Sequence, residues 1–213
     1  MKQPMNQVAK EYGKQSIDLS DRCAWCGTDP FYVKYHDEEW CRPVPDDDRK
    51  MFEFLILESA QAGLSWITIL RKRENYRKAF ARFNAKKVAA FDDGDVERLM
   101  GDAGIVRNRL KIVAAINNAR LFLEIQAGHG GFRDYLLSFF PNGEPIVHHP
   151  KTPSDIPAST ELSDTISREL RRLGFKFFGS TICYAHLQAT GLINDHLESC
   201  PFKYGRPSAN CRP

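Results

Sequence analysis

Cysteine and histidine residues lie near both ends of this sequence at spacings typical of metal ligands. Cys23 and His36 stand near the start, and His196 and Cys200 form an H-x3-C pair near the end. Two thiolates and two imidazoles match the ligand set of a tetrahedral structural zinc site. Spacing alone leaves the set open, because Cys23 and Cys26 also form a C-x2-C half-site and single buried cysteines are often only small hydrophobic residues.

A zinc ion held by residues from both ends would join the two ends of the chain. Four protein ligands leave no open coordination position for a catalytic water. We therefore expect this metal to be structural, and a hydrolytic metalloenzyme is the less favoured interpretation.

One carboxylate interrupts an apolar stretch. Glu58 lies in the segment FLILESAQAG, and on a helix its neighbours one turn away are mostly apolar. A carboxylate in that setting carries a large desolvation cost unless it has a partner or a function. The alternative is a position at the edge of the helix, where the side chain reaches water.

Aromatic residues occur close to this carboxylate and to the first metal-type residues. Trp66 follows Glu58 by eight positions, Tyr32 and Tyr35 precede His36, and Trp25 follows Cys23. Such rings usually belong to a hydrophobic core. A pocket for a flat heterocycle, however, needs rings for stacking and a carboxylate that accepts hydrogen bonds from N–H groups.

The segment LMGDAGIVRNRLKIVAAINNAR predicts a helix, a tight glycine-containing turn and a second helix. Backbone N–H groups at the opening of a helix favour an anion, and Arg107, Arg109 and Lys111 follow the turn. This hairpin could bind a DNA phosphate without reading any base. The alternative is an ordinary helical hairpin with a solvated basic face.

The elements that hold these residues are predicted to be helices. Acidic residues 46–48 are typical of a helix start and helix formers follow them, Gly63 suits the end of that helix, and Ser65 suits the cap of the next. The predicted helices span 50–62, 66–83, 95–103, 108–126, from a cap at Ser163 to about Gly174, and from Gly179 to Thr190. Segment 21–46 is expected to be rich in loops, and only 144–148 is typical of a strand. The sequence therefore predicts an all-α protein.

The composition agrees with a globular chain. Of the 213 residues, 42% are hydrophobic and 27% are charged, and the formal charge of +3 is too small to indicate a nucleic-acid partner. No apolar run approaches the ~20 residues of a membrane helix, and the N-terminus lacks the apolar core of a secretory signal. We expect a cytoplasmic protein with no membrane association, whose cysteines are thiols or metal ligands rather than disulfides.

Several segments together resemble the 3-methyladenine DNA glycosylase I family. The matching text is RCAWCG, DPFYVKYHDEEW, LESAQAGLSWITILRKRENYR, DAGIVRNR, LRRLGFKFFGSTICYAHLQATGLINDH and the closing H-x3-C pair. It covers most of the chain, and the order of these long blocks is highly specific. One departure is Cys41, which stands where the family usually has glycine.

The resemblance implies an all-α helix-hairpin-helix glycosylase fold with its terminal segments tied by a structural zinc. The domain would span 22–200 as two helical lobes that share one core, between a polar extension (1–21) and a C-terminal tail (201–213). The ligands carried over by motif are Cys23, His36, His196 and Cys200, and Cys26 becomes an extra thiol beside the site.

The resemblance also implies hydrolysis of the N-glycosidic bond of 3-methyladenine in double-stranded alkylated DNA by a monomer, with free 3-methyladenine as product. Glu58 would recognise the flipped base and support the reaction electrostatically, with Trp66, Tyr35 and Trp25 around the ring. The phosphate contacts would fall on the hairpin, at Gly104, Val106, Arg107 and Arg109. No lysine nucleophile occurs in the matching motifs, so the enzyme would be monofunctional. The rival hypothesis is a zinc-stapled DNA-binding module without catalysis.

Overall fold

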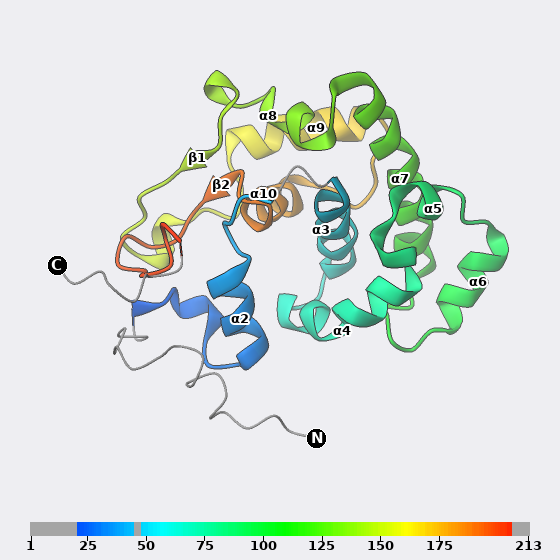
Figure 1. Ribbon diagram of the computed structural model, residues 1–213, viewed down its shortest axis with the longest axis horizontal. Helices are drawn as coiled ribbons and strands as arrows, with labels where there is room; N and C mark the ends of the chain where they lie inside the picture. Colours follow the sequence, from blue (N-terminus) through cyan, green and yellow to red (C-terminus); the bar gives the residue numbers. More distant parts are fainter. Residues whose placement is uncertain (1–20, 45–47, 206–213) are drawn as a thin grey trace.

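The computed structural model describes residues 21–44 and 48–205, and helices account for most of them (Figure 1). The longer helices are α2 (Pro30–Glu38), α3 (Asp48–Gln61), α4 (Trp66–Ala79), α5 (Ala85–Ala89), α6 (Asp93–Gly101), α7 (Arg109–His129), α8 (Phe132–Leu137), α9 (Glu161–Arg172) and α10 (Ser180–Ala189). Short 3-10 turns occur at Ala24–Cys26, Ala81–Phe83, Pro141–Gly143 and Pro153–Asp155. The expectation of an all-α architecture is confirmed for the described residues.

Helix α3 carries Glu58 and lies in the middle of the molecule, so that all its residues from Met51 to Ala60 are buried (Figure 1). It ends at Gln61, and Gly63 follows with a φ of 80°, the left-handed region that favours glycine. Ser65 is the N-cap residue of α4, as predicted. Asp46 and Asp47 lie outside the described residues.

The predicted helical hairpin is present as α6, the connection 102–108 and α7. Helix α6 begins with a capping box in which Asp92 and Asp95 satisfy each other's backbone N–H groups. Helix α7 begins after Asn108, whose side chain accepts a hydrogen bond from the N–H of Lys111. The cap at Asn108 fixes where the connection ends and α7 begins.

Three predicted elements need correction. Segment 21–46 is not simply loop-rich, because it contains α2, which starts with Pro30 at its first position and Asp29 as its cap. Helix α4 ends at Ala79 rather than continuing to residue 83, because Ala81–Phe83 have φ values of 50–56°. The cap of α9 is Thr160 rather than Ser163, which instead completes the capping box at the third helical position.

A two-stranded parallel sheet joins distant parts of the chain. Strand β1 (Ile146–Val147), within the predicted strand segment, pairs with β2 (Ile193–Asn194), which the sequence analysis did not predict. The pairing places the C-terminal segment after α10 beside the connection between α8 and α9 (Figure 1). The residues that follow β2 are therefore fixed against the body of the protein.

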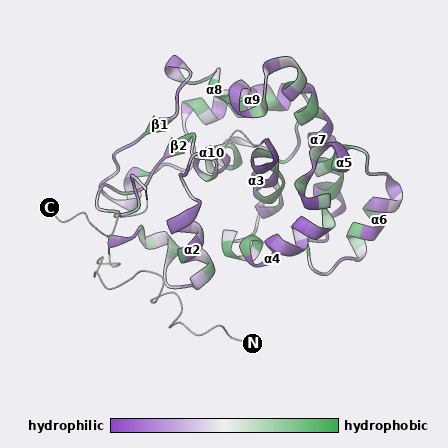
Figure 2. Cartoon of the chain, in the orientation of Figure 1, coloured by the Kyte–Doolittle hydropathy of each residue, from purple (hydrophilic) through white to green (hydrophobic). Residues whose placement is uncertain are grey.

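The buried hydrophobic residues form one continuous cluster, to which every helix longer than five residues contributes. Hydrophobic and hydrophilic segments alternate along the outer helices in Figure 2, as expected for helices that bury one face. The cluster includes Phe202, so the first residues of the predicted tail pack into the body of the protein. Within the described ranges, no helix combines the length and apolar character that crossing a membrane requires.

Candidate functional site

Four side chains from the two ends of the chain form a buried cluster with the chemistry of metal ligands. Cys23 and His36 come from the start of the described chain, and His196 and Cys200 follow β2. One ligand atom from each lies within 4.8 Å of all the others, and all four residues are buried. Cys26 is not part of this cluster, so the predicted set is the one that the fold brings together, and the C-x2-C alternative is not.

The spacing of these atoms fits tetrahedral zinc. The Sγ atom of Cys200 lies 3.4 Å from Nδ1 of His196 and 3.6 Å from Nε2 of His36, and Cys23 Sγ lies 3.6 Å from Nδ1 of His196. With Zn–S of ~2.3 Å and Zn–N of ~2.0–2.1 Å at tetrahedral angles, S···N separations should be about 3.5 Å. The four residues therefore already lie at the distances that a shared zinc ion would impose.

The other ring nitrogen of each histidine has an acceptor. Nδ1 of His36 lies 2.7 Å from Oδ1 of Asp37, whose carboxylate also accepts two hydrogen bonds from the Arg22 guanidinium. Nε2 of His196 lies 3.2 Å from the carbonyl oxygen of Trp40. Such partners fix the tautomer and turn the free nitrogen lone pair toward a metal.

The two thiols of the cluster differ in acidity, since the pKa of Cys200 is lowered and that of Cys23 is raised. The pKa of the Cys200 thiol is held well below its usual range, because Cys23 donates a hydrogen bond to it and both histidines lie within hydrogen-bonding distance. The thiolate is the form of cysteine that binds a metal. The lowered pKa therefore favours the thiolate form of Cys200, which can bind a metal without first losing a proton to a base.

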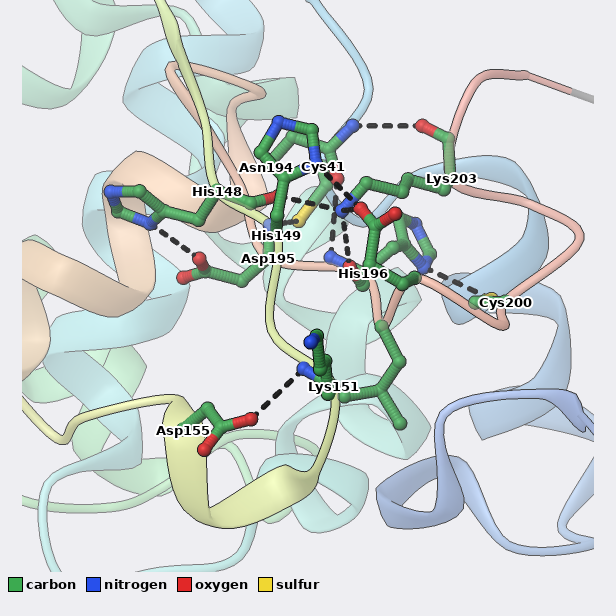
Figure 3. Close-up of polar contacts among 12 residues, drawn as sticks. Cys41, His148, His149, Lys151, Asp155, Asn194, Asp195, His196, Cys200 and Lys203 are labelled. Atoms are coloured by element: carbon green, nitrogen blue, oxygen red, sulfur yellow. Dashed lines mark hydrogen bonds and ion pairs between the residues drawn. The ribbon is translucent and has the colours of Figure 1, made fainter.

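Polar contacts around the segment that carries His196 and Cys200 hold this C-terminal part of the chain in place (Figure 3). Lys203 is buried and its Nζ donates to the carbonyl oxygens of His148 and His196, at 2.6 and 2.8 Å. The Asp195 carboxylate accepts a hydrogen bond from the Tyr184 hydroxyl, and its Oδ1 lies 2.7 Å from Nδ1 of His148. The sequence analysis missed these residues, since no spacing rule marks a polar side chain as a support.

Cys41, which stands where the family usually has glycine, also lies close to this C-terminal segment. Cys41 has a φ of 57°, in the region that favours glycine, and its Sγ accepts a hydrogen bond from the N–H of Asp195 at 3.3 Å. The backbone therefore keeps the conformation of a glycine turn, and the extra thiol lies buried against the segment that carries His196.

A cavity of about 250 Å³ lies beside the metal-type cluster. Its walls come from α2, α3, α4 and α10, and from the turns near residues 25, 40 and 156. The lining residues are Trp25, Tyr32, Tyr35, Trp40, Glu58, Gln61, Trp66, Ile156, Ala185 and Gln188. The volume is slightly below that of pockets for drug-sized ligands, which suits a single heterocyclic base.

Aromatic rings form much of the cavity wall. Trp25 contacts Trp40 and Tyr32 edge to face, with centroid distances of 4.8 and 5.3 Å, and Tyr35 contacts Trp66 in the same way at 5.4 Å. The Nε1 atom of Trp66 is buried without a hydrogen-bond partner among the described residues. The predicted aromatic residues Trp25, Tyr35 and Trp66 are thus brought together, and Trp40 and Gln188 are additions from the structure.

Glu58 provides a carboxylate at this cavity. Its side chain is 2% exposed and its Oε2 has no hydrogen-bond partner among the described residues. Burial raises the pKa of Glu58 from 4.5 to about 8, so the group carries a proton at neutral pH while the cavity is empty. The alternative position at a solvated helix edge is thereby wrong.

In the hairpin connection, the backbone N–H groups of Gly104 and Val106 already donate to acceptors within the protein. The N–H of Gly104 donates to Asp102 Oδ1 at 2.7 Å, and the N–H of Val106 donates to the Tyr76 hydroxyl at 3.1 Å. Arg109 forms an ion pair with Glu97. Arg107 is exposed and makes no ion pair with a described residue, so it is the hairpin group most available to a phosphate.

Comparison with known proteins gives one consistent result. The model of the methyladenine glycosylase family matches residues 25–204. The DNA-3-methyladenine glycosylase 1 of Escherichia coli (strain K12) is 51% identical over 180 residues, which cover 84% of this chain and 95% of that protein.

Solved structures agree with the sequence comparison. A crystal structure of a 3-methyladenine DNA glycosylase I superposes with a TM-score of 0.80 at 45% identity, covering 90% of this chain and 100% of the other. A Staphylococcus aureus enzyme, solved to define its recognition of 3-methyladenine, superposes with a TM-score of 0.81 at 39% identity, covering 86% and 96% of the two chains. The similarity thus extends over the described helices as well as the motifs.

Proposed function

Because this chain belongs to the methyladenine glycosylase family, we propose that it removes 3-methyladenine from alkylated DNA by hydrolysing the N-glycosidic bond, as the first step of base-excision repair. The observation that carries the proposal is the buried Glu58 carboxyl, without a partner for Oε2 among the described residues, at an aromatic cavity sized for one base. Recognition of the base is assigned to Glu58, Trp66, Tyr35 and Trp25.

The chemistry follows from the charge of the damaged base. A purine alkylated at N3 within DNA is cationic, so it is an activated leaving group and is cheaper to extrude from the stack than a normal base. When the C1′–N9 bond breaks, its electron pair neutralises the ring, and the oxygen of a water molecule bonds to C1′ while a proton passes to solvent. The reaction thus needs little acid–base help from the protein.

Glu58 supplies the electrostatic part of this scheme. A cation entering the cavity favours the ionised form of the carboxyl, because an opposite charge lowers the pKa that burial had raised. The carboxylate then accepts hydrogen bonds from the N–H groups of the purine and complements its positive charge. The described cavity wall contains no lysine, which supports hydrolysis without a covalent intermediate.

The metal cluster supports a structural zinc ion in the proposed scheme. Cys23, His36, His196 and Cys200 would complete a closed tetrahedral site, and such an ion supplies folding energy rather than a reactive water. With such an ion bound, His36 and His196 would be fixed, and with them the wall residues Trp25 and Trp40 that pack against the His36 ring.

The proposed partner is double-stranded DNA, bound by a monomer in the cytoplasm. The connection between α6 and α7 is proposed as a helix-hairpin-helix phosphate site. Arg107 supports this assignment most directly, and the N–H groups of Gly104 and Val106 would have to exchange their internal acceptors for a phosphate. Arg109 would contribute less because of Glu97.

The test of the proposed function is release of a base. DNA treated with a methylating agent is incubated with the protein, and the released bases are separated by chromatography. We expect 3-methyladenine in the supernatant and an abasic strand that breaks only after alkali treatment, with much slower release by the matched variant Glu58→Gln. Binding of the DNA without release of any base would instead identify a non-catalytic DNA-binding module.

A further inference from the structure

Gln188 brings an amide group to the cavity that contains Glu58. It lies near the end of α10, and α10 packs against α3, the helix that carries Glu58 (Figure 1). The backbone carbonyl oxygen of Gln188 accepts hydrogen bonds from the N–H groups of Cys41 and Gly191, at 2.9 and 3.1 Å. The main chain at Gln188 is therefore fixed, and its side chain enters the cavity wall from a defined position.

The buried carboxylate of Asp195 fixes which way the Gln188 amide faces. Nε2 of Gln188 donates to Oδ2 of Asp195 at 2.6 Å, and the Tyr184 hydroxyl donates to the same oxygen, also at 2.6 Å. A carboxylate oxygen accepts hydrogen bonds and donates none, so the nitrogen end of the amide has to face Asp195. The oxygen end, Oε1, makes no hydrogen bond with a described residue and is the end that remains for a ligand.

A second glutamine of the cavity lacks this restraint. Gln61, the last residue of α3, lines the same cavity, and its side chain makes no hydrogen bond with a described residue. Its amide can present either its donor or its acceptor to a ligand, so it does not distinguish between the two. The amide of Gln188 does distinguish, because turning it over would set Oε1 against the Asp195 carboxylate and leave both acceptors without a donor.

The cavity thus offers two acceptors from neighbouring helices, the Glu58 carboxylate and Oε1 of Gln188. Adenine carries an amino group at C6 with two N–H donors, whereas guanine carries the acceptor O6 at the same position. Alkylation at N3 makes both purines cationic, so the charge of the base does not separate them. A pair of fixed acceptors does, because they leave O6 of a guanine unpaired, and a site that hydrogen-bonds a substrate N–H rejects an analogue that lacks it.

We propose that Gln188 is a specificity-determining residue that selects 3-methyladenine over 3-methylguanine, with Oε1 accepting a hydrogen bond from the 6-amino group of the base. The other N–H of that amino group donates to Glu58. Asp195 is a positioning residue, since it holds the amide of Gln188 in the orientation that accepts. The inference rests on the proposed function for the class of ligand, and it adds how one N3-alkylated purine is preferred to another.

The test compares the release of the two bases by the parent protein and by Gln188→Met, which keeps the length of the side chain but has no amide. DNA treated with a methylating agent contains both 3-methyladenine and 3-methylguanine, so both initial rates are measured in one incubation by chromatography. The ratio of the two rates should favour 3-methyladenine in the parent and fall about 10-fold in the variant, the scale of one neutral hydrogen bond. A change in DNA affinity or in the amount of folded protein would alter both rates and leave their ratio unchanged.

The matched control is Tyr184→Phe, which removes another donor to Asp195 from a residue that does not line the cavity, and which should keep the parental ratio. An equal fall of the ratio in Tyr184→Phe would assign the effect to the packing of α10 and contradict the inference. If the parent releases neither base, the proposed function fails. If the parent releases 3-methyladenine but shows no preference over 3-methylguanine, or if Gln188→Met keeps the parental ratio, the role of Gln188 is wrong while the proposed function stands.

Discussion

A buried carboxyl group with an unpartnered oxygen costs the folded protein free energy, and Glu58 is such a group within the described part of the chain. The same protein buries another ionisable side chain with full compensation. Arg73 contacts the carboxylates of both Glu39 and Glu53. The contrast supports the proposal that the partner of Glu58 is a ligand, the damaged base.

The cost at Glu58 predicts a pH-dependent stability. Its pKa is about 8 in the folded protein and near 4.5 in the unfolded chain, so between these values the unfolded chain has released a proton that the folded protein keeps. Stability is therefore lost as pH rises through this window. Glu58→Gln lacks the titrating carboxyl group. As pH rises, its free energy of unfolding should therefore exceed that of the parent by an amount that grows by up to about 1.4 kcal/mol per pH unit.

Denaturant unfolding of both proteins at three pH values within this window, about one unit apart, measures the difference. A gap between the two free energies of unfolding that stays constant over this range would show that Glu58 is ionised in the empty cavity.

Single residues with a distinctive chemistry were the part of the site that the sequence could predict. Glu58 stands out because a charge in an apolar run is rare, and the metal-type residues stand out by type and motif. Gln188 and Trp40 line the same cavity but have no such mark, since α10 and the turn after α2 reach the cavity only through tertiary packing. The support from Lys203 was missed for the same reason.

At the scale of elements, the two arginines of the hairpin between α6 and α7 have different surroundings, although the sequence gives no reason to distinguish them. Arg107 is free of ion pairs among the described residues, whereas Arg109 is paired with Glu97. Gly104 lies against Asn75, and a Cβ atom at that position would stand 2.9 Å from the Asn75 side chain. The connection is thus packed closely onto α4, and its exposed Arg107 is the group to which we assign the proposed phosphate contact.

Replacement of Arg107 by alanine should weaken duplex binding evenly across sequences. Removing one cation that binds a phosphate lowers the slope of log affinity against log salt by about one unit. Arg109→Ala is the matched comparison and should change the slope by less, because Glu97 already neutralises that guanidinium. Equal slopes for the parent and Arg107→Ala, measured by fluorescence anisotropy over a salt series, would remove the hairpin from the DNA-binding surface.

Helix periodicity and capping predicted most of the long helices, with errors at their ends. Helix α2 was missed because prolines, cysteines and aromatic residues around it are typical of loops, although Asp29 and Pro30 form a good helix start. The end of α4 was placed too late because the left-handed turn at Ala81–Phe83 contains no glycine. Strand β2 is two residues long and exists only through its pairing with β1.

At the scale of the whole molecule, contacts between the two ends close the structure. The cluster of Cys23, His36, His196 and Cys200 joins residues as far apart in the chain as Cys23 and His196, and the β1–β2 pair and Lys203 fix the same C-terminal segment. A crosslink between distant residues stabilises a fold by restricting the unfolded chain, and a zinc ion adds its binding energy. The cavity lies between these joined ends and α3, so its shape depends on the closure.

The closure predicts about one zinc ion per chain in the purified protein. Cys23→Ser and His196→Ala should each lose the metal and, at a cost of about 3 kcal/mol, lower Tm by roughly 6–12 °C for a chain of this size. Cys26→Ser is the matched control and should keep both the zinc ion and the parental Tm. Full zinc content by elemental analysis together with parental melting in Cys23→Ser and His196→Ala would contradict the site.

The most direct test of the central claim is a calorimetric titration of free 3-methyladenine into the parent protein and Glu58→Gln. Hydrogen bonds from the N–H groups of the bound base favour the ionised form of the Glu58 carboxyl. A hydrogen bond to a charged group is worth roughly 1.5–3 kcal/mol, so the variant should bind the base about 10- to 150-fold more weakly while its affinity for undamaged DNA stays close to parental. Equal affinity of the two proteins for 3-methyladenine would remove Glu58 from the recognition site and contradict the account.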